Sequence, residues 1–238
     1  MKNEKRLSRK KKVTLVVGAF GFLALIAIFL VWTNLGRIAK GVIEYYGPTI
    51  LGVPVRVSSV ALSPLSGRGE IHNLLIGNPS GYSVDHLMRL RKAGVEVDLK
   101  SLRTNVIHIQ ALYIDGADLV WEGDLSNSNF LQVQKHAAAF PHTESKNGSE
   151  KKIVIDRVVI INTKATAQLK GFLGAEIPFP NIEMSHLGTP EKGLAAGEVV
   201  NQIFAKLSSE IILSLSRSPQ IINKFIKGGQ SLIHLLGK

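Results

Sequence analysis

Apolar side chains change their spacing along this chain, and each spacing predicts a different kind of element. Residues 13–32 form one run without a charged side chain. A helix rises about 1.5 Å per residue, so these twenty residues would span about 30 Å, the thickness of the hydrocarbon core of a bilayer. The pattern therefore predicts a transmembrane helix over 13–32, followed by one domain over 33–238.

Helical spacing recurs at both ends of that domain. Over 34–47 the apolar side chains fall three or four residues apart, which predicts a helix that Gly47-Pro48 ends, because proline cannot continue it. A short helix is expected over 127–140. A long amphipathic helix follows from about residue 193, and its apolar face comprises Ala196, Val199, Val200, Ile203, Phe204, Leu207, Ile211 and Leu215.

Ser218-Pro219 supplies an N-cap and a first-turn proline for a last amphipathic helix, which extends to about residue 236. Its apolar side chains favour packing on the domain's own sheet. Lys224 and Lys227 keep a second interpretation open, in which this helix lies on a membrane surface.

Between these helices, apolar and polar residues alternate, which predicts β-strands with one buried face. The alternation is clearest over 53–58, 93–100 and 107–112, and strands resume over 153–163, 164–172 and around 177–184. Turn residues separate the strands at Ser63-Pro64, Gly77–Gly81, Asp115-Gly116 and Glu122–Asp124. Strands that follow one another this closely predict an antiparallel meander, in which Asp115-Gly116 is interpreted as a hairpin turn.

Together these patterns predict an α+β fold. It consists of an N-terminal transmembrane helix, a mainly antiparallel sheet with one apolar face, and C-terminal amphipathic helices over about 193–236. The polar window at about 141–151 is expected to be a mobile loop. An apolar sheet face needs a cover, which either helices or a ligand can supply.

Charge decides how the predicted membrane helix is oriented. Residues 1–12 carry seven basic side chains against one acid, Glu4, and short flanks rich in Lys and Arg stay in the cytoplasm. The N-terminus is therefore expected in the cytoplasm and the domain on the other side of a single membrane crossing. In a two-membrane bacterium this means an inner-membrane anchor and a periplasmic domain, and otherwise an extracytoplasmic space generally. A cleaved signal peptide is the alternative, but the apolar run is longer than its usual core and ends in Trp32-Thr33 without a small-residue cleavage site.

More than half of the net charge of +11 comes from residues 1–12. Of 29 basic and 18 acidic residues, 22 and 17 remain in the rest of the chain, which leaves +5. That is no concentrated basic stripe, so nucleic acid is not expected as a partner. The chain has no cysteine, which excludes disulfides, thiolate metal sites and cysteine catalysis.

The sequence shows no constellation typical of catalysis or metal binding. The seven histidines lack the i, i+4 spacing of a metalloprotease helix, and no phosphate-binding glycine loop or serine elbow is present. An enzyme would most plausibly use Asp115, Asp118 or Glu122 with a histidine such as His108. The protein is therefore predicted not to be an enzyme and to bind no cofactor and no metal.

The segment Gly69–Pro79 resembles the pattern Gly-x-Ile-x-Asn-Leu-x-Ile-x-Asn-Pro of the AsmA family of bacterial envelope proteins. The resemblance begins at Leu51 and continues through Val95–Leu99, Ile107–Val120 and Phe179–Ile203, so that it extends over about two-thirds of the chain. Larger members of that family are related to bridge-like lipid-transfer proteins, whose curved sheets form an apolar groove for acyl chains. The resemblance therefore implies a curved sheet with an apolar concave face. This chain has room for one groove unit, so the resemblance implies a subunit, an adaptor or a short shuttle module.

The resemblance implies a role in phospholipid transport or envelope maintenance, through binding of acyl chains or docking on a larger transport assembly. Expected partners are membrane lipid and an envelope protein or a second copy. Ten residues are expected to line the lipid-binding face: Val55, Val57, Ile71, Leu74, Val95, Val97, Ile107, Ile109, Val154 and Val158. For each of them, a place in the ordinary hydrophobic core is the alternative. The alternative function is a scaffold subunit of an inner-membrane complex that binds no lipid itself.

Overall fold

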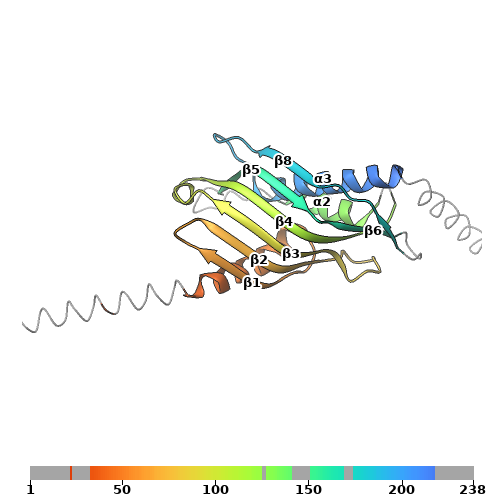
Figure 1. Cartoon of the computed structure of the whole chain (residues 1–238), viewed down its shortest axis with the longest axis horizontal. Helices are drawn as coiled ribbons and strands as arrows, with labels where there is room; N and C mark the ends of the chain where they lie inside the picture. Colours follow the sequence, from red (N-terminus) through yellow and green to blue (C-terminus); the bar gives the residue numbers. More distant parts are fainter. Residues whose placement is uncertain (1–21, 23–32, 125–126, 141–150, 169–173, 218–238) are drawn as a thin grey trace, which may run out of the picture.

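The computed structural model describes residues 22, 33–124, 127–140, 151–168 and 174–217, and it confirms the α+β class (Figure 1). Among these residues, no helix is both long enough and apolar enough to cross a membrane. The predicted transmembrane helix over 13–32 lies outside the described residues except for Phe22. The same is true of the predicted last helix and of nearly all of the predicted loop at 141–151.

The first helix of the domain covers residues 33–51, so the prediction that it ends at Gly47-Pro48 is wrong. It ends instead at Gly52, whose φ of 71° reverses the chain and whose N–H donates to the carbonyl of Pro48 at 2.9 Å. Packing explains the extension, because Leu51 is 7% exposed and a Cβ on Gly47 would lie 3.0 Å from the Cβ of Val55. Tertiary contact here outweighs the one helical hydrogen bond that proline loses.

The strands form one mixed sheet of eight in the order β1-β2-β3-β4-β5-β8, with β6 beside β4 and β7 beside β6. Five of the seven pairings are antiparallel, and β1 to β4 form the predicted meander. Both β5 and β6 run parallel to β4, and a 3-10 turn (Ser101–Arg103) joins β3 to β4. The bounds are β1 Val55–Ser63, β2 Arg68–Gly77, β3 His86–Val97, β4 Val106–Glu122, β5 Lys152–Ile161, β6 Lys164–Gln168, β7 Ala175–Ile177 and β8 Ile182–Leu187.

The predicted hairpin at Asp115-Gly116 is wrong, because β4 runs through both residues without a reversal. Gly116 has a φ of 71°, a left-handed conformation that glycine adopts without strain, and the register with β3 continues across it unchanged. Apolar residues on both sides of it, Ile114 and Ala117, point into the same core although they lie three residues apart. The Asp-Gly pair therefore shifts the alternation within one strand.

The same shift occurs in neighbouring strands, and the shifted positions lie in one row across the sheet. Asn73 in β2 has a φ of 51° and Asn162, after β5, has a φ of 53°. The strand registers place Asn73 opposite Arg91 and Arg91 opposite Gly116. We call Asn73, Arg91, Gly116 and Asn162 the shift row, because the alternation of inward and outward side chains shifts there by one residue. Because a one-residue shift turns every following side chain over, the row keeps apolar residues on one face only if all strands shift together.

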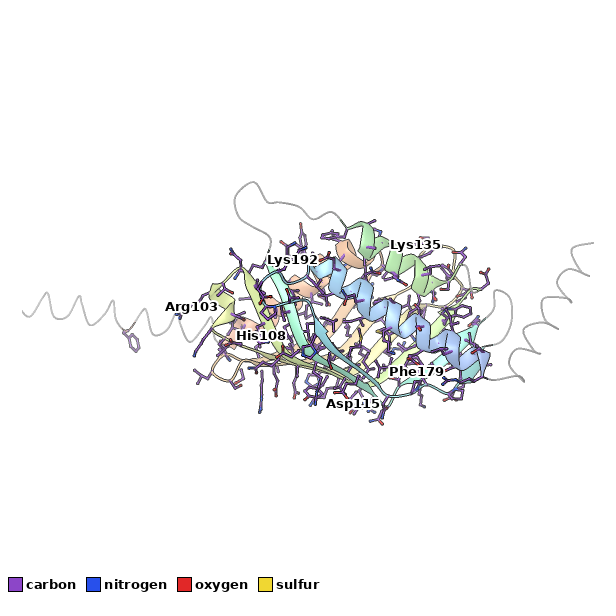
Figure 2. The ribbon with its side chains drawn as sticks, turned by 90° about the horizontal axis from the view of Figure 1, so that it is seen from above. Arg103, His108, Asp115, Lys135, Phe179 and Lys192 are labelled. Carbon is purple, nitrogen blue, oxygen red and sulfur yellow. The ribbon has the colours of Figure 1, made fainter. Side chains whose placement is uncertain are left out.

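Two helices cover that face, α2 (Asn129–Ala139) and α3 (Ala196–Ser216), and both were predicted from the sequence. Ser128 caps α2 by accepting the N–H of Leu131 at 3.2 Å, and Glu198 of α3 accepts the N–H of Ala195 at 2.7 Å. Figure 2 shows the two helices next to each other above the strands, where the rings of Phe130 and Phe204 lie 5.7 Å apart. The core is thus a single layer between the sheet and this helix pair.

Candidate functional site

The two faces of the sheet differ in chemistry. One face carries ion pairs between neighbouring strands: Arg68–Glu96 at 3.0 Å, Lys92–Glu70 at 2.9 Å and Arg91–Asp115 at 3.7 Å. The hydrogen bond from Lys92 lowers the pKa of the Glu70 carboxyl. This face is stable in water, whereas the opposite, apolar face is stable only where something covers it.

The cover is complete on one side of the shift row. There, towards the loop that joins β2 to β3, helices α2 and α3 and the end of the first helix pack on the strands. The strand side chains on this side are between 0% and 6% exposed: Val55, Ile76, Met88, Leu90, Ala117, Leu119 and Trp121. This half of the apolar face is ordinary protein core.

On the other side of the shift row the apolar face is only partly covered. We call this part the apolar corner, and its residues are Val60, Leu62, Gly69, Ile71, Val95 and Val97. Leu62 is 41% exposed, and the other side chains of the corner are half-buried. A Cβ on Gly69 would lie 2.9 Å from Leu62 and 3.0 Å from Val95, so the missing side chain lets those two approach each other.

Nine of the ten residues predicted to line the lipid-binding face lie on the apolar face, but at different depths. Val55, Val57 and Val158 are at most 6% exposed and are therefore ordinary core residues. The partly buried residues among the nine are Ile71, Leu74, Val95, Val97, Ile107 and Ile109. Of the predicted set, Ile71, Val95 and Val97 fall in the apolar corner.

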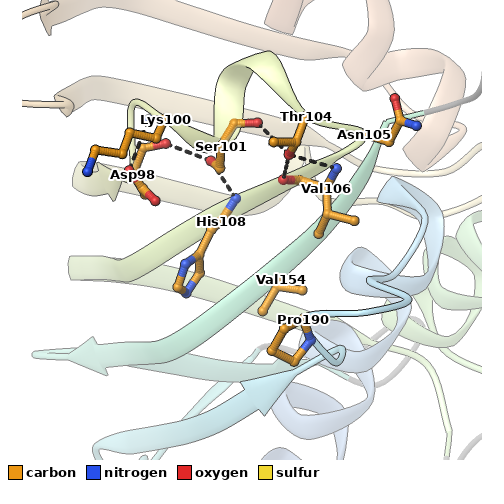
Figure 3. Close-up of a pocket in the computed structure, with 9 residues that line it drawn as sticks. All are labelled: Asp98, Lys100, Ser101, Thr104, Asn105, Val106, His108, Val154 and Pro190. Carbon is orange, nitrogen blue, oxygen red and sulfur yellow. Dashed lines mark hydrogen bonds between the residues drawn. The ribbon is translucent and has the colours of Figure 1, made fainter.

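Val154 lies on the opposite face. Its neighbours Ile153 and Ile155 point to the core, so alternation turns Val154 away from it. It lines a hollow with His108 and Pro190, shown in Figure 3. Val154 is therefore no part of a surface shared with the other nine.

The polar groups around that hollow bond to one another. The hydroxyl of Ser101 donates to the carbonyl of Asp98 at 2.6 Å and accepts the N–H of His108 at 2.9 Å. The ring of His108 lies 2.8 Å from a carboxylate oxygen of Asp156. These contacts hold the connection between β3 and β4 and leave the donor and acceptor groups of Ser101 occupied.

The residues considered for catalysis are not brought together. Asp115 pairs with Arg91, His108 with Asp156, and Asp118 lies 3.7 Å from the buried ring of His86. Within the described residues, no three His, Cys, Asp or Glu side chains lie close enough to hold a metal ion.

Glu122 is fully buried, which the sequence did not reveal. Its carboxylate accepts the N–H and the hydroxyl of Ser83 at 2.9 and 2.8 Å and the N–H of Val84 at 3.1 Å. The amide of Asn129 then joins this group to Asn78 at 3.0 Å. Glu122 thus fixes the loop after β2 against the end of β4, which is a structural role.

Comparisons of the chain with protein-family models, with curated proteins and with solved structures returned no match. The geometry of the sheet is therefore what bears on function. A strand surface that is charged on one side and apolar on the other, with part of the apolar side accessible, is suited to holding hydrocarbon chains or an apolar partner surface.

Proposed function

We propose that this protein is a membrane-anchored periplasmic module, similar to AsmA proteins, that acts in phospholipid transport or envelope maintenance. It binds acyl chains at the apolar corner or docks there on a larger transport assembly, without catalysis or a cofactor. The observation that carries the proposal is the incomplete cover of the corner, where Leu62 is 41% exposed beside half-buried neighbours. The charge-free run over 13–32 and the AsmA-like segment Gly69–Pro79 support it.

Acyl chains fit this surface on energetic grounds. Each methylene that leaves water gains about 0.8 kcal/mol, so a few methylenes over the corner suffice for a stable contact. We further propose that the sheet is curved and that its apolar face is concave. The register shifts at Ile76/Gly77 and Glu96/Val97 support this, because a β-bulge bends its strand.

Native mass spectrometry of the full chain, extracted from bacterial membranes in mild detergent, tests the proposal. We expect phospholipid to co-purify with the protein. Replacing Leu62 and Val97 by Asp places two charges in the corner and should remove most of this lipid. Ser59→Asp is the matched control, since Ser59 is exposed on the same strand as Leu62 but outside the corner.

Each variant must keep a cooperative thermal unfolding transition for the comparison to count. Equal lipid in the double Asp variant and in Ser59→Asp, both folded, contradicts binding at the corner. A lipid-free protein that recovers a stoichiometric protein partner supports the scaffold function instead.

One surface favours that second function. The first helix exposes an apolar stripe of Ile38, Val42, Tyr45 and Tyr46, whose side chains are between 50% and 73% exposed. Residues spaced in this way on a helix form a continuous strip that a partner helix can cover. Asp substitutions at Ile38 and Val42 should release a protein partner and leave co-purified lipid unchanged if the stripe serves a scaffold.

A further inference from the structure

The first helix and β1 lie side by side and antiparallel. Gly36 meets the carbonyl of Val60, and Gly47 meets the side chain of Val55. From Gly36 to Gly47 the helix advances eleven residues at about 1.5 Å, and from Val55 to Val60 the strand advances five residues at about 3.3 Å. Both distances are about 16 Å, so the helix and the strand run alongside each other over this length. The start of the helix and the end of β1 therefore lie at the same end of the domain.

The turn after β1 extends beyond the start of that helix. From the level of Gly36 and Val60, three strand residues reach about 10 Å to Ser63, whereas three helical residues reach about 4.5 Å to Thr33. The turn over 64–67 is thus the outermost part of this end, about 5 Å past the first described residue of the helix. A membrane in which residues 13–32 were anchored would meet this turn.

Three leucines stand on the loops at this end, where polar residues are usual. Leu65, in the turn after β1, is 80% exposed, and Leu99 and Leu102, between β3 and β4, are 36% and 44% exposed. The loops adjoin each other, since the N–H of Val97 donates to the carbonyl of Gly67 at 2.9 Å. We call these three leucines, which lie on adjoining loops next to the apolar corner, the apolar tip.

Exposed basic side chains surround this tip. Lys100 and Arg103 flank Leu102 in sequence, and the ammonium of Lys151 donates to the carbonyl of Leu102 at 2.6 Å. Figure 2 shows Arg103 at one extremity of the sheet. The acids nearby are engaged, because Glu96 pairs with Arg68 and Asp98 accepts the N–H of Lys100. Leucines ringed by Lys and Arg match the interface of an anionic bilayer, apolar below and negatively charged above.

We propose that this tip, formed by Leu65, Leu99 and Leu102 with Lys100 and Arg103, enters the headgroup layer of an anionic membrane. The apolar corner then opens directly at the bilayer surface, where an acyl chain can pass between lipid and protein without crossing water. The inference rests on the proposed function in that it takes residues 13–32 as the anchor that brings this end to the membrane.

Spin labels on the full chain, reconstituted into vesicles of phosphatidylethanolamine and phosphatidylglycerol, test the tip. The chain has no cysteine, so Leu65→Cys and Leu102→Cys each give a single label site. Ser80→Cys is the control, an exposed position in the loop at the opposite end of the sheet. We expect the ratio of collisions with oxygen to collisions with a water-soluble nickel chelate to be several-fold higher at Leu65 and Leu102 than at Ser80.

The charges give a second measurement. The double variant Lys100→Glu, Arg103→Glu should lower the ratio of oxygen to chelate collisions at the label on position 65 several-fold. Without these two substitutions, the same ratio should fall several-fold in vesicles made of phosphatidylcholine alone. Labels at Leu65 and Leu102 that are as accessible to the chelate as the label at Ser80 overturn the inference.

Phospholipid bound to the same samples separates the two proposals. If the tip is shielded but the protein carries no phospholipid, only the proposal of acyl-chain binding is contradicted. If the tip is exposed to water but the protein retains phospholipid, only the proposal that the tip enters the membrane is contradicted. A chain that does not float with the vesicles contradicts both.

Discussion

The carboxylate of Glu44 accepts the backbone N–H of Val57 at 2.8 Å, and this bond closes the free edge of the sheet. Lys40 adds a second contact by donating to the carbonyl of Ser58 at 3.3 Å. An open edge strand exposes unpaired N–H and C=O groups that recruit other strands. The first helix therefore protects β1 and also fixes the end of the domain at which residue 33 lies.

Removing the acceptor should weaken this edge. Glu44→Ala is expected to lower the free energy of unfolding by about 1 to 3 kcal/mol, the usual value for a hydrogen bond to a charged group. Glu44→Gln keeps an acceptor oxygen and should lose less. Urea unfolding followed by the fluorescence of Trp121, which is 2% exposed, measures both variants. If Glu44→Ala and Glu44→Gln lose the same free energy of unfolding, the acceptor oxygen contributes nothing and packing alone holds the helix.

Gly116 should resist substitution more than a glycine elsewhere in the sheet. Its φ of 71° is unfavourable for any residue with a Cβ, so Gly116→Ala is expected to cost about 1 to 2 kcal/mol of unfolding free energy. Gly94→Ala is the matched control on β3, where the nearest atoms to an added Cβ are 3.9 Å away. That variant should be neutral or more stable by up to about 1 kcal/mol. Equal effects at both positions would contradict a left-handed backbone conformation at Gly116.

The meander from β1 to β4 was predictable, because alternation and turn residues specify antiparallel neighbours. The prediction of a hairpin at Asp115-Gly116 failed because an Asp-Gly pair suits both a hairpin turn and a left-handed residue within a strand. Only the pairing of β4 along its whole length decides between them. The parallel pairing of β5 with β4 was missed for a related reason, since alternation within a strand does not specify its partner or direction.

The candidate site was predictable in its chemistry but not in its position. Alternation identified the apolar residues, yet which of them remain accessible depends on where α2 and α3 dock. Val55 and Val95 have the same pattern in sequence, but Val55 is 6% exposed beside Gly47 of the first helix and Val95 lies half-buried in the apolar corner. Val154 was predicted on the wrong face because Ile153, Val154 and Ile155 are all apolar. The sequence of β5 therefore does not show which of them point into the core.

Glu122 should matter for stability and not for lipid. Glu122→Gln places an amide donor where the N–H groups of Ser83 and Val84 now meet a carboxylate, and it is expected to cost about 1 to 3 kcal/mol of unfolding free energy. Hydrogen exchange should speed up in the loop after β2. Co-purified phospholipid should not change, because Glu122 lies at the far end of β4 from the apolar corner. Lipid loss in a folded Glu122→Gln protein would contradict the assignment of the site.

Tyr82 gives the protein a dependence on alkaline pH. Burial raises the pKa of its phenol, and the carboxylates of Glu122 and Asp124 raise it further. The folded state thus holds this proton more tightly than the unfolded state. Its contribution to stability is complete below the unfolded pKa of about 10 and is lost as pH rises through the higher pKa of the folded state.

Tyr82→Phe isolates this effect. The phenol oxygen is buried and has no hydrogen-bond partner among the described residues, so its removal should raise the free energy of unfolding by about 1 kcal/mol near pH 8. Urea unfolding at pH 8 and above pH 10 should show a further gain for the variant at the higher pH, because only the unaltered protein loses stability as Tyr82 ionises. The other tyrosines and the lysines titrate alike in both proteins and cancel in the difference. A gap that stays constant with pH would mean that Tyr82 has the same pKa in the folded and unfolded states.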